Sequence, residues 1–237
     1  MAQNKFYWIF WGGIAILLLA WIGYLIYNRQ TERRIVRHET DGYVVLEIYN
    51  EFSAKECDDI CRFSQQKGMS PSNVLTYGTS SDVGVDANNR QSTTAWIKDH
   101  EHSLAQHMAT VSAELSGIPT ENQEMLQVAR YEDGGKFNPH FDACDIDDAE
   151  YKARINHGAG QRYATLLLYL NDEYEGGITE FVDIKLKIRP EKGKAIFFWN
   201  TDEDEEILPN SKHSGHTVKN GNKWICTKWT HPKKWND

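Results

Sequence analysis

Residues 126–142 read Leu-Gln-Val-Ala-Arg-Tyr-Glu-Asp-Gly-Gly-Lys-Phe-Asn-Pro-His-Phe-Asp, and this stretch decides how we interpret the fold. It begins as a plausible strand, breaks at Gly134-Gly135 and ends in His140-x-Asp142. Side chains two residues apart on an extended segment point to the same side. An imidazole and a carboxylate therefore lie side by side in this prediction, as two of the three ligands of a metal site.

A third ligand is available in Ser211-Lys-His-Ser-Gly-His216, which offers both His213 and His216. A two-residue hairpin turn at Asn220-Gly221 would put His216 on the same strand face as Lys223, whereas a bulge or an odd-length loop would favour His213. Strand arithmetic therefore leaves both histidines as candidates. Two imidazoles and one carboxylate, with the opposite positions open, are the ligands of non-haem Fe(II) oxygenases.

The composition is that of a chain with a full hydrophobic core. Of 237 residues, 40% are hydrophobic and 12% aromatic, enough for one membrane anchor and one globular domain of about 200 residues. The net charge of −8 argues against nucleic acid as a partner. The four cysteines form no CxxC motif, so neither a disulfide scaffold nor a tetra-cysteine zinc site is predicted.

An uninterrupted apolar run, residues 6–27, predicts a transmembrane anchor. At ~1.5 Å per helical residue it is about 33 Å long, enough to cross a hydrocarbon core of ~30 Å. A cleaved signal peptide would have a shorter apolar run and a small-x-small cleavage site. We expect an anchor at 1–28, a charged linker at 29–41 and a catalytic domain at 42–237.

Two features of the sequence bear on the orientation of this anchor, and both favour the cytoplasmic side. Arg29, Arg33, Arg34 and Arg37 follow the run, whereas only Lys5 and the amino terminus precede it, and the positive-inside rule then puts the domain in the cytoplasm. The chain has no Asn-x-Ser/Thr sequon that would mark a lumenal glycoprotein.

The remaining pattern predicts a mainly β domain with two helices near its start. A capping box at Ser53–Glu56 opens a helix to about Lys67, and a second helix covers 101–115. Strands are expected at 42–49, 74–77, 93–97, 163–170, 178–182, 184–188 and 194–199, with a final pair flanking Asn220-Gly221. Residues 78–90, 143–160 and 201–206 are expected to be surface segments. Many short strands favour a double-sheet architecture such as a jelly roll.

A set of motifs in order over about residues 42–231 resembles a known family. The motifs are 126–142, Arg162-x-Ala-Thr-x-Leu-x-Tyr-Leu170, Glu175-Gly-Gly-x-Thr179, Ser211-x-His-x-Gly215, Gly221-x-Lys-Trp-x-x-Thr-Lys-Trp229 and, upstream, Asn89-Arg-Gln-Ser-x-x-x-Trp96 and Ile118-Pro-x-Glu-Asn-Gln-Glu124. They resemble the prolyl 4-hydroxylases, which are 2-oxoglutarate- and Fe(II)-dependent dioxygenases on a double-stranded β-helix. The anchor is similar to that of membrane-bound members. The disulfide-isomerase and tetratricopeptide parts found with some animal members are absent, so no partner subunit is evident.

The resemblance implies a role for individual residues. The iron ligands that it implies are His140, Asp142 and His213. His213 is chosen because it precedes Lys223 by ten residues, which is the spacing found in the family. Lys223 is then expected to pair with the distal carboxylate of 2-oxoglutarate. His216 stands where many members have a cysteine or another small residue. Tyr131 and Thr179 match positions that contact the co-substrate or line its pocket, and Arg162, Trp229 and His231 match positions beside the peptide groove.

The resemblance also implies the activity. The expected reaction is 4-hydroxylation of peptidyl proline with Fe(II), 2-oxoglutarate and O₂, giving succinate and CO₂, with L-ascorbate as reductant. The loop 78–90 is expected to order over the peptide. The alternatives are a related dioxygenase acting on another side chain or a small molecule, and an inactive membrane-tethered binding module. The family habit is a type II signal anchor with the domain in the endoplasmic reticulum lumen, and our expectation follows the family although the arginines favour the cytoplasm.

Overall fold

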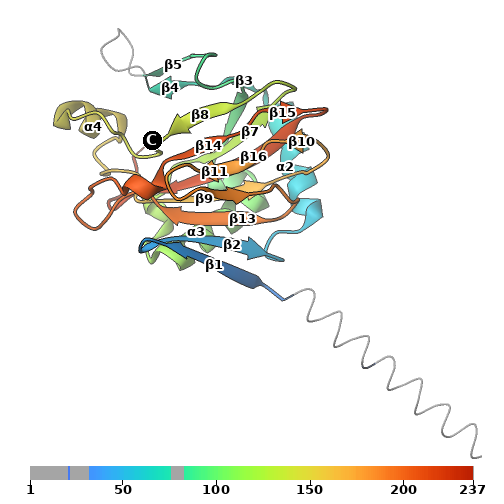
Figure 1. Cartoon of the computed structure of the whole chain (residues 1–237), viewed down its shortest axis with the longest axis horizontal. Coiled ribbons are helices and arrows are strands. Elements are labelled where there is room, and N and C mark those ends of the chain that lie inside the picture. The colour runs from blue at the N-terminus through green and yellow to red at the C-terminus, as the bar shows by residue number, and fades with distance from the viewer. Residues whose placement is uncertain (1–20, 22–31, 76–82, 237) are drawn as a thin grey trace, which may run out of the picture.

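The computed structural model describes Trp21 and residues 32–75 and 83–236. Residues 32–75 and 83–236 form two main β-sheets, two short strand pairs and three α-helices (Figure 1). The predicted anchor, residues 6–27, lies outside the described residues apart from Trp21. Within the described ranges, no helix is both long and apolar enough to cross a membrane. Residues 76–82 of the predicted strand 74–77 and loop 78–90 also lie outside the described part.

The larger sheet has eight strands in the order β1-β2-β13-β9-β16-β7-β6-β3, and its neighbours are antiparallel. These strands are β1 Arg34–Thr40, β2 Tyr43–Tyr49, β3 Ser70–Pro71, β6 Thr93–Ile97, β7 Leu126–Tyr131, β9 Ala164–Tyr169, β13 Ala195–Trp199 and β16 Lys223–Thr230. The smaller sheet has the order β12-β11-β14-β8, formed by β8 Phe137–His140, β11 Thr179–Phe181, β12 Leu186–Ile188 and β14 His213–Gly215. Two short pairs complete the strands: β4 Val74–Leu75 with β5 Val83–Gly84, and β10 Glu175–Gly176 with β15 Val218–Lys219. The predicted double-sheet architecture is confirmed.

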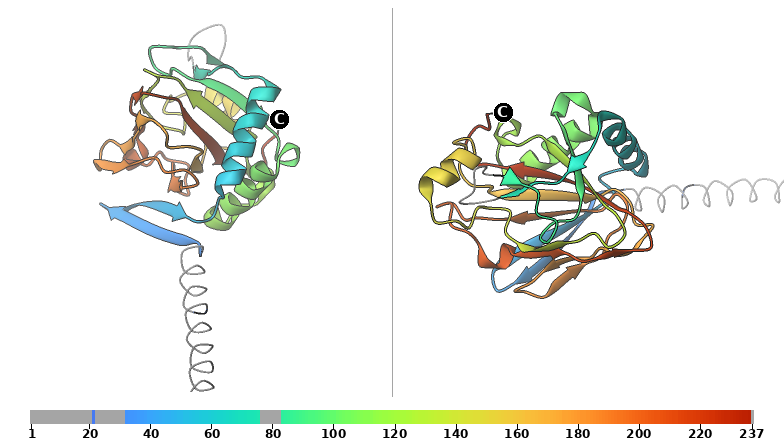
Figure 2. Two further views of the ribbon diagram at one scale, coloured as in Figure 1. Left: turned by 90° about the vertical axis from the view of Figure 1, so that its right-hand side faces the viewer. Right: turned by 90° about the horizontal axis from the view of Figure 1, so that it is seen from above.

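Two helices cover the outer face of the larger sheet, as Figure 2 shows from the side and from above. They are α2 Ala54–Lys67 and α3 Ser103–Ser116, close to the predicted ranges. Both hydrogen bonds of the capping box between Ser53 and Glu56 are present. Helix α3 ends at Gly117, whose left-handed φ of 73° lets its N–H bond back to Ala113.

The residues of β9 alternate between two hydrophobic cores, because successive side chains of a strand point to opposite faces. Leu166 and Leu168 pack among the helices, whereas Leu167 and Tyr169 point between the two sheets. Both faces of the larger sheet are therefore buried at β9, which explains the continuous apolar run of residues 164–170. The polar residues that share the inner face with Tyr169 border the functional site.

The predicted charged linker, residues 29–41, is corrected by the structure. Strand β1 lies within it and pairs with β2 over seven residues. Asp41 and Gly42 join the two strands with φ values of 51° and 76°, the positive values of a type I′ hairpin turn. The Asp-Gly dipeptide was the signal that could have predicted this strand.

The polar stretch 143–160, predicted to be a surface insertion, contains a helix, α4 Ala149–Ile155, which is capped by the Asp148 side chain. One further prediction is wrong. The strands that flank Asn220-Gly221 do not form a hairpin, because β15 pairs with β10, whereas β16 pairs with β7 and β9. The turn instead carries the chain from one layer to the other. The parity argument that favoured His216 therefore does not apply.

Candidate metal centre and substrate groove

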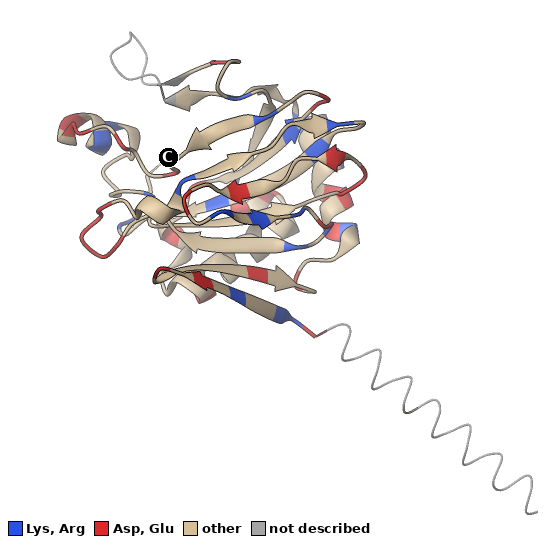
Figure 3. Ribbon diagram, in the orientation of Figure 1, with Lys and Arg blue, Asp and Glu red and all other residues tan. Residues whose placement is uncertain are grey.

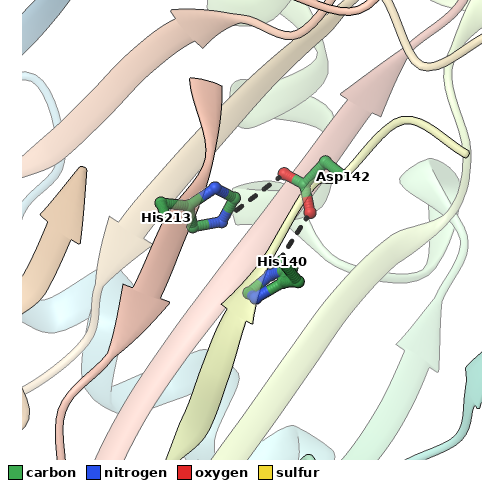
Figure 4. Close-up of side chains that lie close together, drawn as sticks. All are labelled: His140, Asp142 and His213. Carbon is green, nitrogen blue, oxygen red and sulfur yellow. Dashed lines mark ion pairs between the residues drawn. The ribbon is translucent and has the colours of Figure 1, made fainter. Parts of the chain in front are cut away.

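Three predicted ligands meet at one end of the smaller sheet (Figure 4). His140 is the last residue of β8 and lies opposite His213, the first residue of β14. Asp142 follows two residues after His140, and one ligand atom from each of the three side chains lies within 4.8 Å of the others. The Asp142 oxygens are 3.8 Å from His140 Nε2 and 3.9 Å from His213 Nε2, too far for direct hydrogen bonds. His216 does not belong to this set of ligand atoms and instead pairs through Nε2 with Glu180.

Backbone carbonyls fix the tautomers of both histidines. His140 Nδ1 lies 2.8 Å from the Asn138 oxygen, and His213 Nδ1 lies 2.9 Å from the Ser211 oxygen. Because a carbonyl only accepts hydrogen bonds, each Nδ1 carries a proton, and in the neutral imidazole Nε2 then keeps its lone pair. Burial, with the neighbouring His213, lowers the pKa of His140 to about 3, so this imidazole is neutral. Neutral imidazoles are the form that binds a metal ion.

The carboxylate of Asp142 is also held in place from behind. Thr165 donates its hydroxyl to Oδ2 at 2.6 Å, and the Asn200 amide donates to the Thr165 oxygen at 2.8 Å. Burial opposes ionisation, but the charges of His213 and His140 in their protonated forms, with Arg162 and the Thr165 hydrogen bond, more than offset it and hold the pKa of Asp142 below its usual range. The donor set is two imidazoles and one carboxylate with oriented partners, so these residues fit Fe(II).

A narrow cavity extends from the three ligands toward Lys223, between the two sheets. We call it the inner cavity, and its lining includes Tyr131, Leu167, Thr179, Lys223 and Ile225 beside the ligands. Lys223 and Tyr131 face inward because they lie opposite each other in the pairing of β16 with β7. Thr179 is 2% exposed and accepts a hydrogen bond from the Tyr169 hydroxyl at 2.7 Å.

Lys223 is a buried cation without an anionic partner in the described part of the chain. Its side chain is 3% exposed, and Nζ donates to the Gly177 carbonyl at 2.6 Å. The rings of Tyr131 and Tyr169 lie 5.8 and 5.6 Å from Nζ. Burial lowers the pKa of Lys223 to about 7. A buried ammonium of this kind requires a negatively charged ligand to be stable.

A second hollow, which we call the outer groove, passes the three ligands on the side opposite the inner cavity. Its lining includes Trp96, Asp145, Arg162 and Trp229. The Arg162 guanidinium lies 3.7 Å from the centre of the Trp229 ring and pairs with Glu124 at 2.5 Å. The Trp229 indole N–H has no acceptor among the described residues.

The predicted groove residue His231 lies behind this surface. It is fully buried and hydrogen bonds through Nε2 to Glu124 at 3.0 Å and through Nδ1 to the Gly160 carbonyl at 2.8 Å. Burial opposes ionisation of Glu124, but Arg162 and His231 lower its pKa to about 2. His231 therefore positions the Glu124–Arg162 pair and does not line the groove.

Two lining residues were missed at the sequence level. The Phe137 ring stacks on His140 with its centre 3.5 Å away, and the buried Arg90 guanidinium lies 4.9 Å from the Phe137 ring centre. Arg90 also donates to Gln127 at 2.8 Å. Phe137 lies in the motif 126–142, three residues before His140, and Arg90 lies in the motif 89–96. Both residues therefore belong to motifs that resemble the family, but the resemblance assigned no role to either of them.

The fold and the three-ligand site define a class of protein, the Fe(II)- and 2-oxoglutarate-dependent oxygenases. A comparison with protein families agrees, because residues 126–231 match the 2OG-Fe(II) oxygenase superfamily. Enzymes of this class use Fe(II), 2-oxoglutarate and O₂.

Within this class, the chain belongs to the prolyl 4-hydroxylase family. It is 30% identical over 188 residues to a putative prolyl 4-hydroxylase of Acanthamoeba polyphaga mimivirus, covering 79% of this chain and 74% of that protein. The solved viral collagen prolyl hydroxylase of Paramecium bursaria Chlorella virus-1, in complex with 2-oxoglutarate, is 29% identical with a TM-score of 0.63, covering 80% of this chain and 96% of that one. Prolyl 4-hydroxylase subunit alpha-1 of Gallus gallus is 34% identical over 147 residues, which cover 62% of this chain. The aligned region is 28% of that longer protein.

Proposed function

We propose that this protein hydroxylates peptidyl proline at C4 with Fe(II), 2-oxoglutarate and O₂, and with L-ascorbate as reductant. The observation that carries the proposal is the uncompensated Lys223 in the same cavity as His140, Asp142 and His213. A dicarboxylate that reaches the metal with one end places its other carboxylate against this ammonium. Without such a ligand, the buried and unpaired ammonium destabilises the folded protein, and no interaction within the chain compensates for it.

Each part of the chain has a defined task in this reaction. Bound Fe(II), together with O₂ and 2-oxoglutarate, supplies the oxidation that replaces C–H with C–OH, while 2-oxoglutarate is converted to succinate and CO₂. Lys223 anchors the co-substrate, and Thr165 keeps the Asp142 carboxylate oriented. The apolar walls of the inner cavity, such as Leu167 and Ile225, exclude water from the space between them.

The outer groove suits an extended peptide with a proline ring. Trp96 and Trp229 lie with ring centres 6.1 Å apart, and the exposed Trp96 offers a flat apolar surface to the ring. The mimiviral and chlorella-viral relatives are described as prolyl hydroxylases, which supports proline as the target.

The proposal is tested by following 2-oxoglutarate turnover with Fe(II) and ascorbate, first alone and then with proline-rich peptides. The expected result is peptide-stimulated succinate formation and one added oxygen per hydroxylated proline, placed at C4 by amino-acid analysis. Turnover that no proline peptide stimulates would reject proline and leave a dioxygenase for another side chain or a small molecule. An absence of any turnover would leave the binding-module alternative.

For the location, we propose a single-pass protein anchored through residues 6–27, with its domain in the endoplasmic reticulum lumen. The length of the apolar run and the family habit support this arrangement. Arg33, close after the run, pairs with Glu114 at 2.8 Å and with Glu51 at 3.3 Å. These contacts tie the start of the domain to helix α3. Protease protection of the domain in sealed microsomes tests the orientation, and digestion without detergent would place the domain in the cytoplasm.

A further inference from the structure

A tryptophan near the carboxyl end of the chain covers a fully buried histidine. The Trp235 indole stacks on the His231 imidazole, with ring centres 4.6 Å apart and an angle of 30° between the ring planes. His231 is 0% exposed, whereas Trp235 is partly exposed. The indole also contacts His157, with ring centres 4.6 Å apart, so the end of the chain lies beside the insertion 143–160 that carries α4 (Figure 3).

Backbone hydrogen bonds fix the position of this tail, residues 231–236. The Trp235 N–H donates to the Glu121 carbonyl at 3.0 Å, and the Lys233 N–H donates to the Ala159 carbonyl at 3.0 Å. The indole therefore has a defined place over the imidazole.

Both ring nitrogens of His231 face groups that accept hydrogen bonds. Nδ1 lies 2.8 Å from the Gly160 carbonyl oxygen, and Nε2 lies 3.0 Å from a carboxylate oxygen of Glu124. Burial opposes ionisation of Glu124, but Arg162 and His231 lower its pKa to about 2, so its oxygens only accept. A carbonyl oxygen also only accepts. Both nitrogens therefore carry protons, and His231 is an imidazolium ion.

The indole face stabilises this charged form of the imidazole. A cation within about 6 Å of the centre of a Trp ring is attracted by the negative face of the ring. The separation of 4.6 Å and the nearly parallel planes place the His231 ring on that face of Trp235. Without the indole, the protonated form of His231 loses this stabilisation, and the proton is released at a lower pH.

The charge on His231 is linked to the outer groove through one carboxylate. Glu124 Oε1 accepts from His231 Nε2 at 3.0 Å and from Arg162 Nε at 2.5 Å, and Glu124 Oε2 accepts from Arg162 Nη2 at 3.0 Å. Arg162 lines the outer groove together with Asp142. Glu124 therefore fixes the direction of the Arg162 guanidinium, and His231 fixes Glu124.

A neutral His231 would disturb this arrangement. Its single proton would serve either Glu124 or the Gly160 carbonyl, and the other oxygen would face a nitrogen lone pair at hydrogen-bond distance. The repulsion would displace Glu124, and with it the guanidinium of Arg162.

The charged and titratable groups near His231 come from several elements. The contacts in the described part of the chain place these groups around it: Glu124, Arg162 behind Glu124, His157 across the indole, and Lys228 with its partner Asp99 at the Glu124 carbonyl.

We propose that Trp235 is a positioning residue for peptide binding, which keeps His231 protonated and through Glu124 holds Arg162 in the outer groove. Its kinetic consequence rests on the proposed proline hydroxylation. Trp235 is not among the residues that line the inner cavity or the outer groove. Its effect is therefore expected in KM for the peptide and in the pH dependence of that KM, with kcat and the affinity for 2-oxoglutarate unchanged.

The kinetic test compares Trp235→Ala, Trp235→Phe and the unaltered protein, each loaded with Fe(II) and saturated with 2-oxoglutarate and ascorbate, between pH 6 and 9. Trp235→Ala should raise KM for a proline-rich peptide by about fivefold at the higher pH, as for loss of one cation–π contact, and less at pH 6. Trp235→Phe keeps an aromatic face and should restore most of the native KM. Lys234→Ala, at an exposed neighbour in the same tail, is the matched control and should change nothing.

The protonation of His231 is measured separately by ¹⁵N NMR of labelled histidine, with Zn(II) in place of Fe(II) and no peptide. The His231 signal, assigned by its absence from His231→Gln, should show two protonated nitrogens. In Trp235→Ala one of these protons should be lost at a lower pH than in the unaltered protein.

The outcomes separate this inference from the proposed function. A His231 with one proton at pH 6, or a KM and pH profile that Trp235→Ala leaves unchanged, would overturn the inference and leave proline hydroxylation intact. A lower melting temperature of Trp235→Ala with the native KM would show a purely structural role and would also overturn it, as would equal losses in the alanine and phenylalanine variants. Failure to hydroxylate any proline peptide would overturn the proposed function and the kinetic role of Trp235 together, whatever the NMR signal shows.

Discussion

Nζ of Lys223 lies 2.6 Å from the carbonyl oxygen of Gly177, and no carboxylate in the described part of the chain reaches it. A side chain at Gly177 would come within 3.1 Å of the Lys223 Cδ atom, so the glycine leaves the space that the lysine occupies. The ammonium therefore faces the inner cavity with its position fixed and its charge uncompensated.

Binding of 2-oxoglutarate is expected to depend on pH through Lys223. Burial lowers its pKa to about 7, and a bound carboxylate will raise it. Below pH 7 the free protein is already protonated at this site and affinity is at its maximum. Above pH 7 the proton must be taken up on binding, so the affinity for 2-oxoglutarate falls by up to about tenfold per pH unit. Calorimetry between pH 6 and 9 in buffers of different ionisation enthalpy should show this loss and proton uptake. A pH-independent affinity without proton uptake would contradict it.

Lys223→Met is expected to remove 2-oxoglutarate binding while stabilising the ligand-free protein. The pKa of Lys223 falls from 10.5 to about 7 on folding, so folding releases a proton between these values. The cost of burying the charge is complete below pH 7 and decreases as pH rises to 10.5. A methionine of similar shape carries no such cost, and the melting temperature should rise by about 3 °C at pH 6.5. The difference from the unaltered protein should shrink by pH 10, and an equal or lower melting temperature at pH 6.5 would contradict the expectation.

His213→Ala and His216→Ala are expected to have opposite outcomes. His213 presents a free Nε2 beside Asp142, so its removal should abolish tight Fe(II) binding and 2-oxoglutarate turnover. His216 is partly exposed and pairs with Glu180 at the surface, so its removal should leave most of the activity. Metal content after gel filtration and succinate formation measure both effects. The reverse result would assign the third ligand to His216.

Local spacing predicted the parts of the site that depend on strand periodicity. His140 and Asp142 converge as predicted, although Asp142 lies in a bend after the end of β8. Lys223 faces inward with Tyr131 because the side chains of β16 alternate. Contacts between segments distant in the sequence were not predictable in this way. His231 was expected at the groove but is buried against Glu124, which lies 107 residues away.

The Asn220-Gly221 dipeptide shows why a local turn signal did not determine strand pairing. The dipeptide does turn the chain, but Val218 on its first side pairs with Gly176 in another sheet. On its second side, Lys223 pairs with Tyr131. Burial of both faces of β16 outweighs the pairing of neighbouring strands, and that balance depends on the whole fold.

Thr165→Val is expected to weaken metal binding although Thr165 is not itself a ligand. Its hydroxyl donates to Asp142 at 2.6 Å and accepts from Asn200 at 2.8 Å, so it orients the carboxylate within a buried chain of hydrogen bonds. Valine keeps the shape but removes both bonds, and loss of such an orienting partner lowers metal affinity by about 10- to 100-fold. Thr165→Ser keeps the hydroxyl and is the matched control, with near-normal affinity expected. Competition with a chelator gives the Fe(II) affinity. Thermal unfolding without metal gives the loss of stability caused by the unpaired Asn200 amide, which can then be separated from the loss of metal affinity. Equal affinities for the valine and serine variants would show that Asp142 keeps its orientation without the hydroxyl.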